Sequence, residues 1–222
     1  MRKLTSNGFT IVEMMIATAV FSVILLVVTA GVLAFSKQYM QGQTASNLQF
    51  TGRQIVAQVG QDVQFGGTVD NSGGGTIDGT HVYEIGCYRL GANIYLYQIG
   101  SKVGDGQHGL VMIPNVSQPC ATLYPSFTVN TLKNAMSQAG ARELLSNGQR
   151  LLDFSVNSPG PTSPYNIKVK LAGGEDDMLT DGTNQVRLAP ATVDWGNLRC
   201  KTGAGREYCA VLTLSGAATK RV

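Results

Sequence analysis

The acidic residues between 175 and 184 form the densest cluster of candidate metal ligands in this chain. Asp176, Asp177 and Asp181 lie close together, with Glu175 before them and Asn184 after them. Ca²⁺ binds several oxygens from a flexible loop, and these side chains offer such oxygens. Their spacing differs from that of an EF-hand, and an acidic loop is usually only solvated. Calcium held by Asp176, Asp177 and Asp181 is therefore a hypothesis, and no other cofactor is expected.

The four cysteines, Cys87, Cys120, Cys200 and Cys209, all follow an apolar N-terminal segment. An even number of cysteines beyond a membrane anchor is typical of disulfides in an oxidising, extracytoplasmic compartment. Of the three pairings that four cysteines allow, proximity in the sequence favours Cys87–Cys120 with Cys200–Cys209. Zinc is the alternative, but the chain has no Cys-x-x-Cys motif and no nearby histidine ligand.

Residues that would indicate an enzyme are scattered. His81 and His108 are far apart in the sequence, and no Gly-x-Ser-x-Gly or His-Glu-x-x-His motif occurs. A nucleophile needs a base and an orienting group within reach, and no such set is recognisable here. The sequence therefore predicts a protein that is not an enzyme.

Glu13 is the only charged residue between Lys3 and Lys37, and it lies at the membrane end of an apolar stretch. A carboxylate in that position is costly, so it requires a partner or a function. If the chain is cut after Gly8, the new α-amine of Phe9 is a candidate partner, in the same subunit or in a neighbour. The alternative is that Glu13 lies in the membrane interface and is solvated.

The apolar N-terminal segment, which contains Glu13 and precedes the cysteines, is long enough to cross a membrane. Residues 14–35 contain no charge, proline, asparagine or glutamine, and about 20 apolar helical residues span a bilayer core. An ordinary signal peptide has its small-residue cleavage site after the apolar stretch, whereas Gly8 precedes it here. Arg2 and Lys3 on the short N-terminal side place that end in the cytoplasm. The expected order is a leader over residues 1–8 and a spanning helix over residues 9–35.

The helix is expected to continue as an amphipathic segment over residues 36–65. Leu48, Ile55, Val59 and Val63 recur at spacings of seven or four, which gives one apolar face. The glycine-rich stretch 66–75 then indicates a flexible connection. Short alternating segments follow, and the expected strands are 81–90, 93–99, 110–113, 151–156, 165–171 and 210–214, with one helix over 132–145. The fold class is therefore α+β, with a long N-terminal helix packed on an antiparallel β-sheet domain over residues 66–222.

The overall charge does not indicate nucleic acid as a partner. The formal net charge is +3, from 17 basic and 14 acidic residues. Loss of Arg2 and Lys3 with the leader leaves 15 basic against 14 acidic residues. A surface that binds the phosphate backbone of a nucleic acid is usually clearly basic, with clustered lysines and arginines.

The stretch Gly8-Phe9-Thr10-Ile11-Val12-Glu13, followed by a long apolar helix, resembles the N-terminal signal of type IV pilins and pseudopilins. The resemblance implies that a prepilin peptidase cuts after Gly8 and methylates Phe9. It also implies that Glu13 acts in filament assembly by pairing with a neighbouring N-terminus. The partners implied are other pilin or pseudopilin subunits, an inner-membrane assembly platform, and membrane lipid before assembly.

A second resemblance concerns whether the subunit is a minor or a major one. Residues 53–64 and the end of the chain around Cys209 are similar to large minor pilins and J-type minor pseudopilins. Many major pilins have a kinking proline near the position of Ala30, and none occurs in residues 1–113 here. The expected function is that of a minor subunit of a type IV pilus or type II secretion filament, first in the inner membrane and then in the filament. The alternative is a single-pass extracellular adhesin or receptor with an uncleaved signal anchor.

Overall fold

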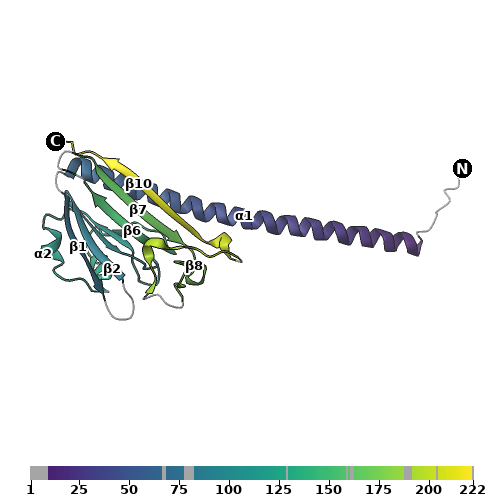
Figure 1. Cartoon of the computed structure of the whole chain (residues 1–222). Coiled ribbons are helices and arrows are strands. Elements are labelled where there is room, and N and C mark those ends of the chain that lie inside the picture. Colours follow the sequence, from purple (N-terminus) through teal and green to yellow (C-terminus); the bar gives the residue numbers. More distant parts are fainter. Residues whose placement is uncertain are drawn as a thin grey trace. The chain divides into compact units, whose positions relative to one another are not determined.

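The computed structural model describes residues 10–66, 69–77, 83–128, 130–158, 160, 163–187, 192–203 and 205–221. The chain divides into two compact units, one up to Met40 and one from Gln41 onward. The division falls inside one helix, α1 (Ile11–Gly66), which Figure 1 shows together with the strands of the second unit. The predicted fold class is confirmed, because the described elements are a long apolar N-terminal helix and antiparallel sheets.

A five-stranded antiparallel sheet forms the first layer of the second unit. Its strands follow one another in sequence order, as β1 (Val69–Ile77), β2 (Tyr83–Leu90), β3 (Asn93–Gln98), β4 (Leu110–Ile113) and β5 (Arg142–Glu143). Residues 114–141, between β4 and β5, form the longest connection of this sheet. Two short helices, α2 (Cys120–Leu123) and α3 (Thr131–Ala135), pack on one face of this sheet.

A three-stranded antiparallel sheet forms the second layer. Its spatial order is β10 (Ala210–Ala218), β7 (Tyr165–Gly173) and β6 (Gln149–Asn157), with β7 in the centre. Ile167, Val169 and Leu171 of β7 are buried, whereas Lys168 is exposed, so the predicted alternation of this strand is confirmed. A small third sheet pairs β8 (Leu179–Thr180) with β9 (Arg199–Cys200). Three short 3-10 helices are η1 (Asp176–Met178), η3 (Trp195–Asn197) and η4 (Arg206–Tyr208).

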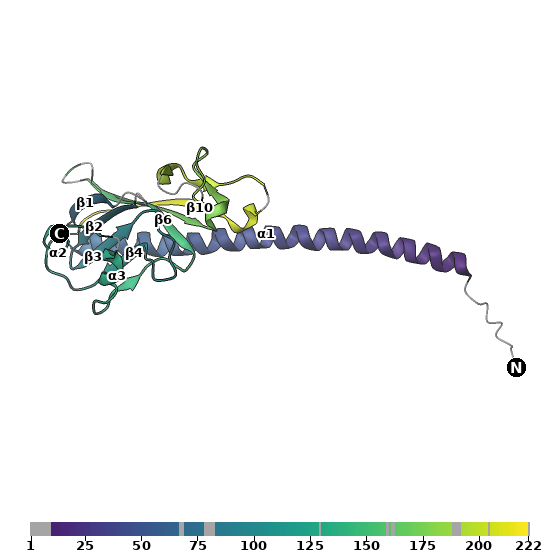
Figure 2. The same cartoon turned by 90° about the horizontal axis from the view of Figure 1, so that it is seen from below.

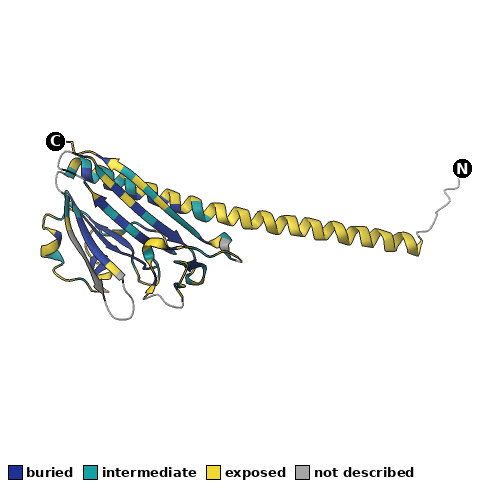
Figure 3. Cartoon of the chain, viewed as in Figure 1, coloured by how far each residue is buried: buried dark blue, intermediate teal, exposed yellow. Residues whose placement is uncertain are grey.

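The Gln41–Gly66 part of α1 packs against both of the larger sheets. Its apolar face is buried at Leu48, Ile55, Val59 and Val63, as the periodicity predicts. Figures 1 and 2 show β10 and β7 running beside this part of the helix. Figure 3 shows the buried residues concentrated in the strands and on this face of α1. Burial of apolar side chains is thus the main force that attaches the helix to the sheets.

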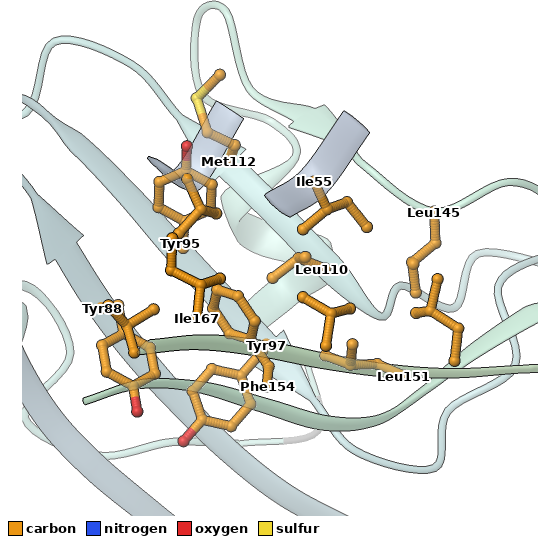
Figure 4. Packing of buried hydrophobic residues seen from close by; sticks show 14 of the residues in the cluster. Ile55, Tyr88, Tyr95, Tyr97, Leu110, Met112, Leu145, Leu151, Phe154 and Ile167 are labelled. Carbon is orange, nitrogen blue, oxygen red and sulfur yellow. The ribbon is translucent and has the colours of Figure 1, made fainter. Parts of the chain in front are cut away.

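Aromatic side chains fill the centre of the shared core (Figure 4). The ring of Phe154 on β6 lies 5.4 Å from that of Tyr88 and 5.7 Å from that of Tyr97, both in edge-to-face arrangements. Tyr95 of β3 is completely buried in the same cluster. Edge-to-face aromatic pairs are favourable beyond the area that they bury, so this cluster fixes the two sheets against each other.

Two glycines allow the end of α1 to reach the turn between β2 and β3. A Cβ added to Gly66 would lie 2.6 Å from the Cα of Gly91. Gly91 also has a φ of +64°, a conformation that favours glycine. Side chains at these positions would therefore push the helix end away from the sheet.

Two expectations from the sequence were wrong. The stretch 66–75 was expected to be a flexible connection, but α1 ends at Gly66 and β1 begins at Val69, pairing with β2 through an irregular register between Ser72 and Gly75. Its glycines hide the strand because they remove the alternation that marks one. The expected helix over residues 132–145 is only α3, and β5 occupies Arg142–Glu143 because tertiary pairing with β4 outweighs local helix propensity.

Candidate functional site

Thr10 and Glu13 form the hydrogen bonds that begin α1. The backbone N–H and the hydroxyl of Thr10 both donate to Oε2 of Glu13, over 2.9 and 2.8 Å. The backbone N–H of Glu13 in turn donates to the Thr10 hydroxyl over 3.3 Å. This reciprocal arrangement is a capping box, which satisfies backbone donors that the first turn of a helix leaves open. Glu13 therefore has a partner within its own chain.

Thr10 is a capping residue that the sequence analysis missed. Its signal is the spacing Thr-x-x-Glu directly before an apolar run, which marks a capping box. Gly8 and Phe9 lie outside the described residues, so the cut after Gly8 and the pairing of Glu13 with the Phe9 amine stay predictions.

The apolar side chains of α1 in the first unit are exposed along its whole length. Ile11 is 81% exposed, Leu26 is 72% exposed and Phe35 is 69% exposed. Among the described residues, α1 is the one helix long and apolar enough to cross a membrane. Water is a poor solvent for such a surface, so this segment requires lipid or other apolar helices around it.

Hydroxyl groups within the apolar segment are satisfied inside the helix. Thr18 donates to the carbonyl of Met14 over 3.0 Å, and Ser22 donates to the carbonyl of Thr18 over 2.7 Å. Thr29 makes the same kind of hydrogen bond. Because an apolar surrounding offers no partner for a hydroxyl, these internal bonds make the segment compatible with lipid.

Residues 4–29 match a family model described as the prokaryotic N-terminal methylation motif. The match covers the capping box, both residues of the expected cleavage site and much of the apolar segment. This motif and the long apolar helix that follows it are consistent with the type IV pilin-like family. The motif implies processing by a prepilin peptidase, membrane anchoring through the apolar helix, and assembly with other pilin subunits, in a family that is structural rather than catalytic. Comparisons with curated proteins and with solved structures find no match.

The four cysteines form two disulfides. They are Cys87–Cys120 and Cys200–Cys209, the pairing that sequence proximity favours. The first joins β2 to α2 and closes the larger loop, with a sequence separation of 33, and the second has a sequence separation of 9. Cys87 and Cys120 lie in a buried cluster on the face of the five-stranded sheet that α3 covers. Each disulfide thus fastens a loop-rich region to a sheet.

Asp181 holds a loop together through its carboxylate. The backbone N–H groups of Asn184, Thr183 and Asp194 donate to it over 2.6, 2.7 and 3.0 Å. These hydrogen bonds, that from Asn184 foremost, lower the pKa of Asp181 to about 2. The carboxylate is therefore ionised and engaged in organising the loop.

The other acidic candidates are also placed by the structure. Asp176 forms an ion pair with Arg150, whose guanidinium also donates to the carbonyl of Gly100 over 3.1 Å. Asp177 is exposed. In the described part of the chain, no group of three or more His, Cys, Asp or Glu residues is arranged to hold a metal ion. The calcium hypothesis stays a prediction.

His108 and Glu143 lie together beside β4. The Nδ1 atom of His108 is 3.3 Å from Oε2 of Glu143. This oxygen also accepts the backbone N–H of Gly109 over 3.0 Å, and Oε1 of Glu143 accepts that of Leu110 over 2.9 Å. Burial raises the pKa of the Glu143 carboxyl above its ordinary value in spite of these hydrogen bonds. Glu143 thus links β5 to the start of β4. His81 lies outside the described residues.

Asp62 of α1 joins the helix to the five-stranded sheet. Its Oδ2 accepts the hydroxyl of Tyr95 and, over 2.8 Å, the side-chain N–H of Asn93, both from β3. A second link is made by Arg142 of β5, which donates to Oε1 of Gln58 over 2.7 Å. These polar contacts fix the rotation and the height of α1 on the sheet, which apolar packing specifies less sharply.

Proposed function

We propose that this pilin-like protein is a minor pilin or minor pseudopilin, a subunit that contributes to the initiation or assembly of a type IV pilus or a type II secretion filament. A prepilin peptidase removes residues 1–8 and methylates Phe9. The subunit then waits in the inner membrane with its N-terminus in the cytoplasm and residues 41–222 on the other side. An assembly platform transfers it into the filament.

The observation that carries the proposal is the exposed apolar part of α1 that begins at a capping box with one carboxylate. Lipid covers this surface in the monomer, and helices of like subunits replace lipid in a filament. Glu13 is the one charge between Lys3 and Lys37. A charge in such a place is costly unless it is paired, and pairing with the amine of a neighbouring subunit would favour one register of assembly over others.

The continuity of α1 supports a minor rather than a major subunit. The helix passes Ala30 without a proline and runs unbroken to Gly66. The domain that follows is large, with three sheets and two disulfides. A bulky domain suits a subunit used in few copies, where it is not repeated along the shaft.

N-terminal mass spectrometry of the protein from its own cells tests the processing step. The mature chain is expected to begin at methylated Phe9. A chain that begins at Met1, or one cut beyond residue 35, contradicts the proposal and favours an anchored adhesin or receptor.

Two variants separate the charge of Glu13 from its role in the capping box. Glu13→Gln removes the charge but keeps a side chain that can accept in the box, whereas Thr10→Ala keeps the charge and weakens the box. Replacement of a threonine cap by alanine costs about 1 kcal/mol of helix stability. If charge pairing directs assembly, Glu13→Gln loses filament incorporation and Thr10→Ala largely retains it.

The amount of each variant in membranes is the control, because both are expected to insert as well as the natural chain. Equal incorporation of Glu13→Gln and the natural chain would refute a role for the charge. Loss of incorporation only in Thr10→Ala would assign Glu13 to the helix start alone.

A further inference from the structure

β10 is an outer strand of the three-stranded sheet and has a partner strand on one side. Its nine residues pair with β7 in one continuous register, from Ala210 opposite Gly173 to Ala218 opposite Tyr165, without a bulge. Figure 1 shows β10 at the border of this sheet, beside α1. Among the described residues, no backbone hydrogen bond reaches the other side of β10 from a loop or a second strand.

The composition of β10 lacks the features that protect sheet edges. Its sequence, AVLTLSGAA, has no charged residue and no proline. Soluble proteins usually blunt an outer strand with charges, proline, a bulge, a short length or a covering segment, because a row of open backbone groups pairs readily with other chains. A nine-residue, regular and uncharged edge is therefore a surface built for strand pairing.

In the described part of the two larger sheets, the other outer strands are protected in these ways. β5 has two residues, Arg142 and Glu143, and both are charged. β1 has a register irregularity and lies next to α2. The outer side of β6 receives backbone N–H groups of Gly100 and Val103, each over 2.8 Å. β10 thus differs from the other outer strands of these two sheets.

We propose that β10 binds an extended strand of a neighbouring, different pilin-like subunit, which adds a fourth strand to this sheet. The added strand would gain main-chain hydrogen bonds along β10, as in other cases of strand addition. This inference rests on the proposed function, because it assigns a contact surface within the assembly.

The side chains of β10 define the chemistry of the incoming strand. Gly216 and Ala218 lie on the face toward α1, where Val56 and Gly60 of the helix lie against them. Thr213 and Ser215 are exposed on the opposite face. The incoming strand is therefore uncharged, with apolar residues on the α1 side and polar residues on the other.

The proposed function favours a different subunit over a second copy of this chain, because a minor subunit is used in few copies and has other subunits as its neighbours.

Hydrogen exchange of the full chain tests the contact directly. The exchange of β10 amides is compared between the detergent-solubilised monomer and isolated assemblies whose subunits begin at Phe9. About half of the β10 amides are expected to exchange at least about tenfold more slowly in assemblies, because amides alternate in direction along a strand. Amides of β5 serve as the control and are expected to change little.

Two matched lysine substitutions test the edge by mutation. Ala217 and Asn166 lie directly opposite each other on β10 and β7, and both are exposed. Ala217→Lys puts a charge on the edge, whereas Asn166→Lys adds the same charge to the central strand. Ala217→Lys is expected to lower incorporation by about tenfold, since a lysine on an outer strand opposes pairing with a further strand. Asn166→Lys is expected to have little effect, and both monomers should unfold at similar temperatures.

Each outcome bears on the proposal. Unchanged exchange of β10 in assemblies, or equal incorporation of the two variants, overturns it while leaving the proposed function intact. Copurification of two differently tagged copies that is lost in Ala217→Lys would replace the different subunit with a second copy. Complete absence of assemblies containing the chain overturns both the function and this contact.

Discussion

The hydroxyl of Tyr95 provides a direct test of how α1 is attached to the five-stranded sheet. Tyr95 is fully buried and donates to Asp62, which also accepts from Asn93. Burial, and then the hydrogen bond to Asp62, raise the pKa of the Tyr95 phenol above its ordinary value of 10.0. The hydroxyl therefore stays protonated and acts as a donor at neutral pH, and Tyr95→Phe removes this donor while keeping the ring.

The expected loss follows from the charge of the acceptor. A hydrogen bond to a charged group contributes about 1.5–3 kcal/mol. Asp62 is partly buried and keeps its hydrogen bond from Asn93, so the lower half of that range applies. We expect Tyr95→Phe to reduce the free energy of unfolding by about 1.5–2 kcal/mol. For a domain of about 150–250 residues this lowers the unfolding temperature by about 3–8 °C.

Thermal unfolding of the full chain in detergent, followed by circular dichroism, measures this effect. Tyr97→Phe is the control, because Tyr97 is on the same strand and buried, yet Asp62 does not contribute to the pKa of its hydroxyl. In an Asp62→Ala background, Tyr95→Phe should cost less than about 0.5 kcal/mol, since the partner is gone. An equal loss in both backgrounds, or no larger loss than in Tyr97→Phe, would refute the attachment role.

Two further predictions concern the loops of the domain. Replacing Cys87 and Cys120 by serine should lower the free energy of unfolding by about 3–4 kcal/mol. Replacing Cys200 and Cys209 by serine should lower it by about 2–3 kcal/mol, because this pair closes the shorter loop. Denaturant unfolding measures both, and the reverse order would contradict the loop-length argument. The pKa of Asp181 is lowered from its model-compound value of 3.8 to about 2, so its contribution is present above pH 4 and is lost as the pH falls toward 2. NMR titration of this carboxyl checks the value, and a midpoint near 3.8 would be inconsistent with its hydrogen bonds.

Local patterns predicted the elements whose burial follows a simple period. The expected strands 93–99, 110–113 and 165–171 correspond to β3, β4 and β7, and the apolar face of α1 is buried as expected. The sequence did not predict β1, because its glycines show no alternation of apolar and polar residues. It did not predict β5, because two residues are too few to show such an alternation. In both cases the partner strand, rather than the local sequence, determines the conformation.

The candidate site divides in the same way. The capping box of Thr10 and Glu13 depends on residues three apart, so the sequence contains its full signal. The contact between Asp62 and Tyr95 joins residues 33 apart, and only the packing of α1 on the sheet brings them together.

The edge position of β10 is further still from the local sequence. A short uncharged strand has the same sequence pattern in the centre of a sheet as at its border. In the centre it needs no protection against pairing with other chains, because both of its sides are already paired. The spatial order β10, β7, β6 turns an ordinary composition into an open edge. The capping box can thus be read along the chain, whereas the surface proposed to bind a neighbouring subunit emerges only from the order of the strands.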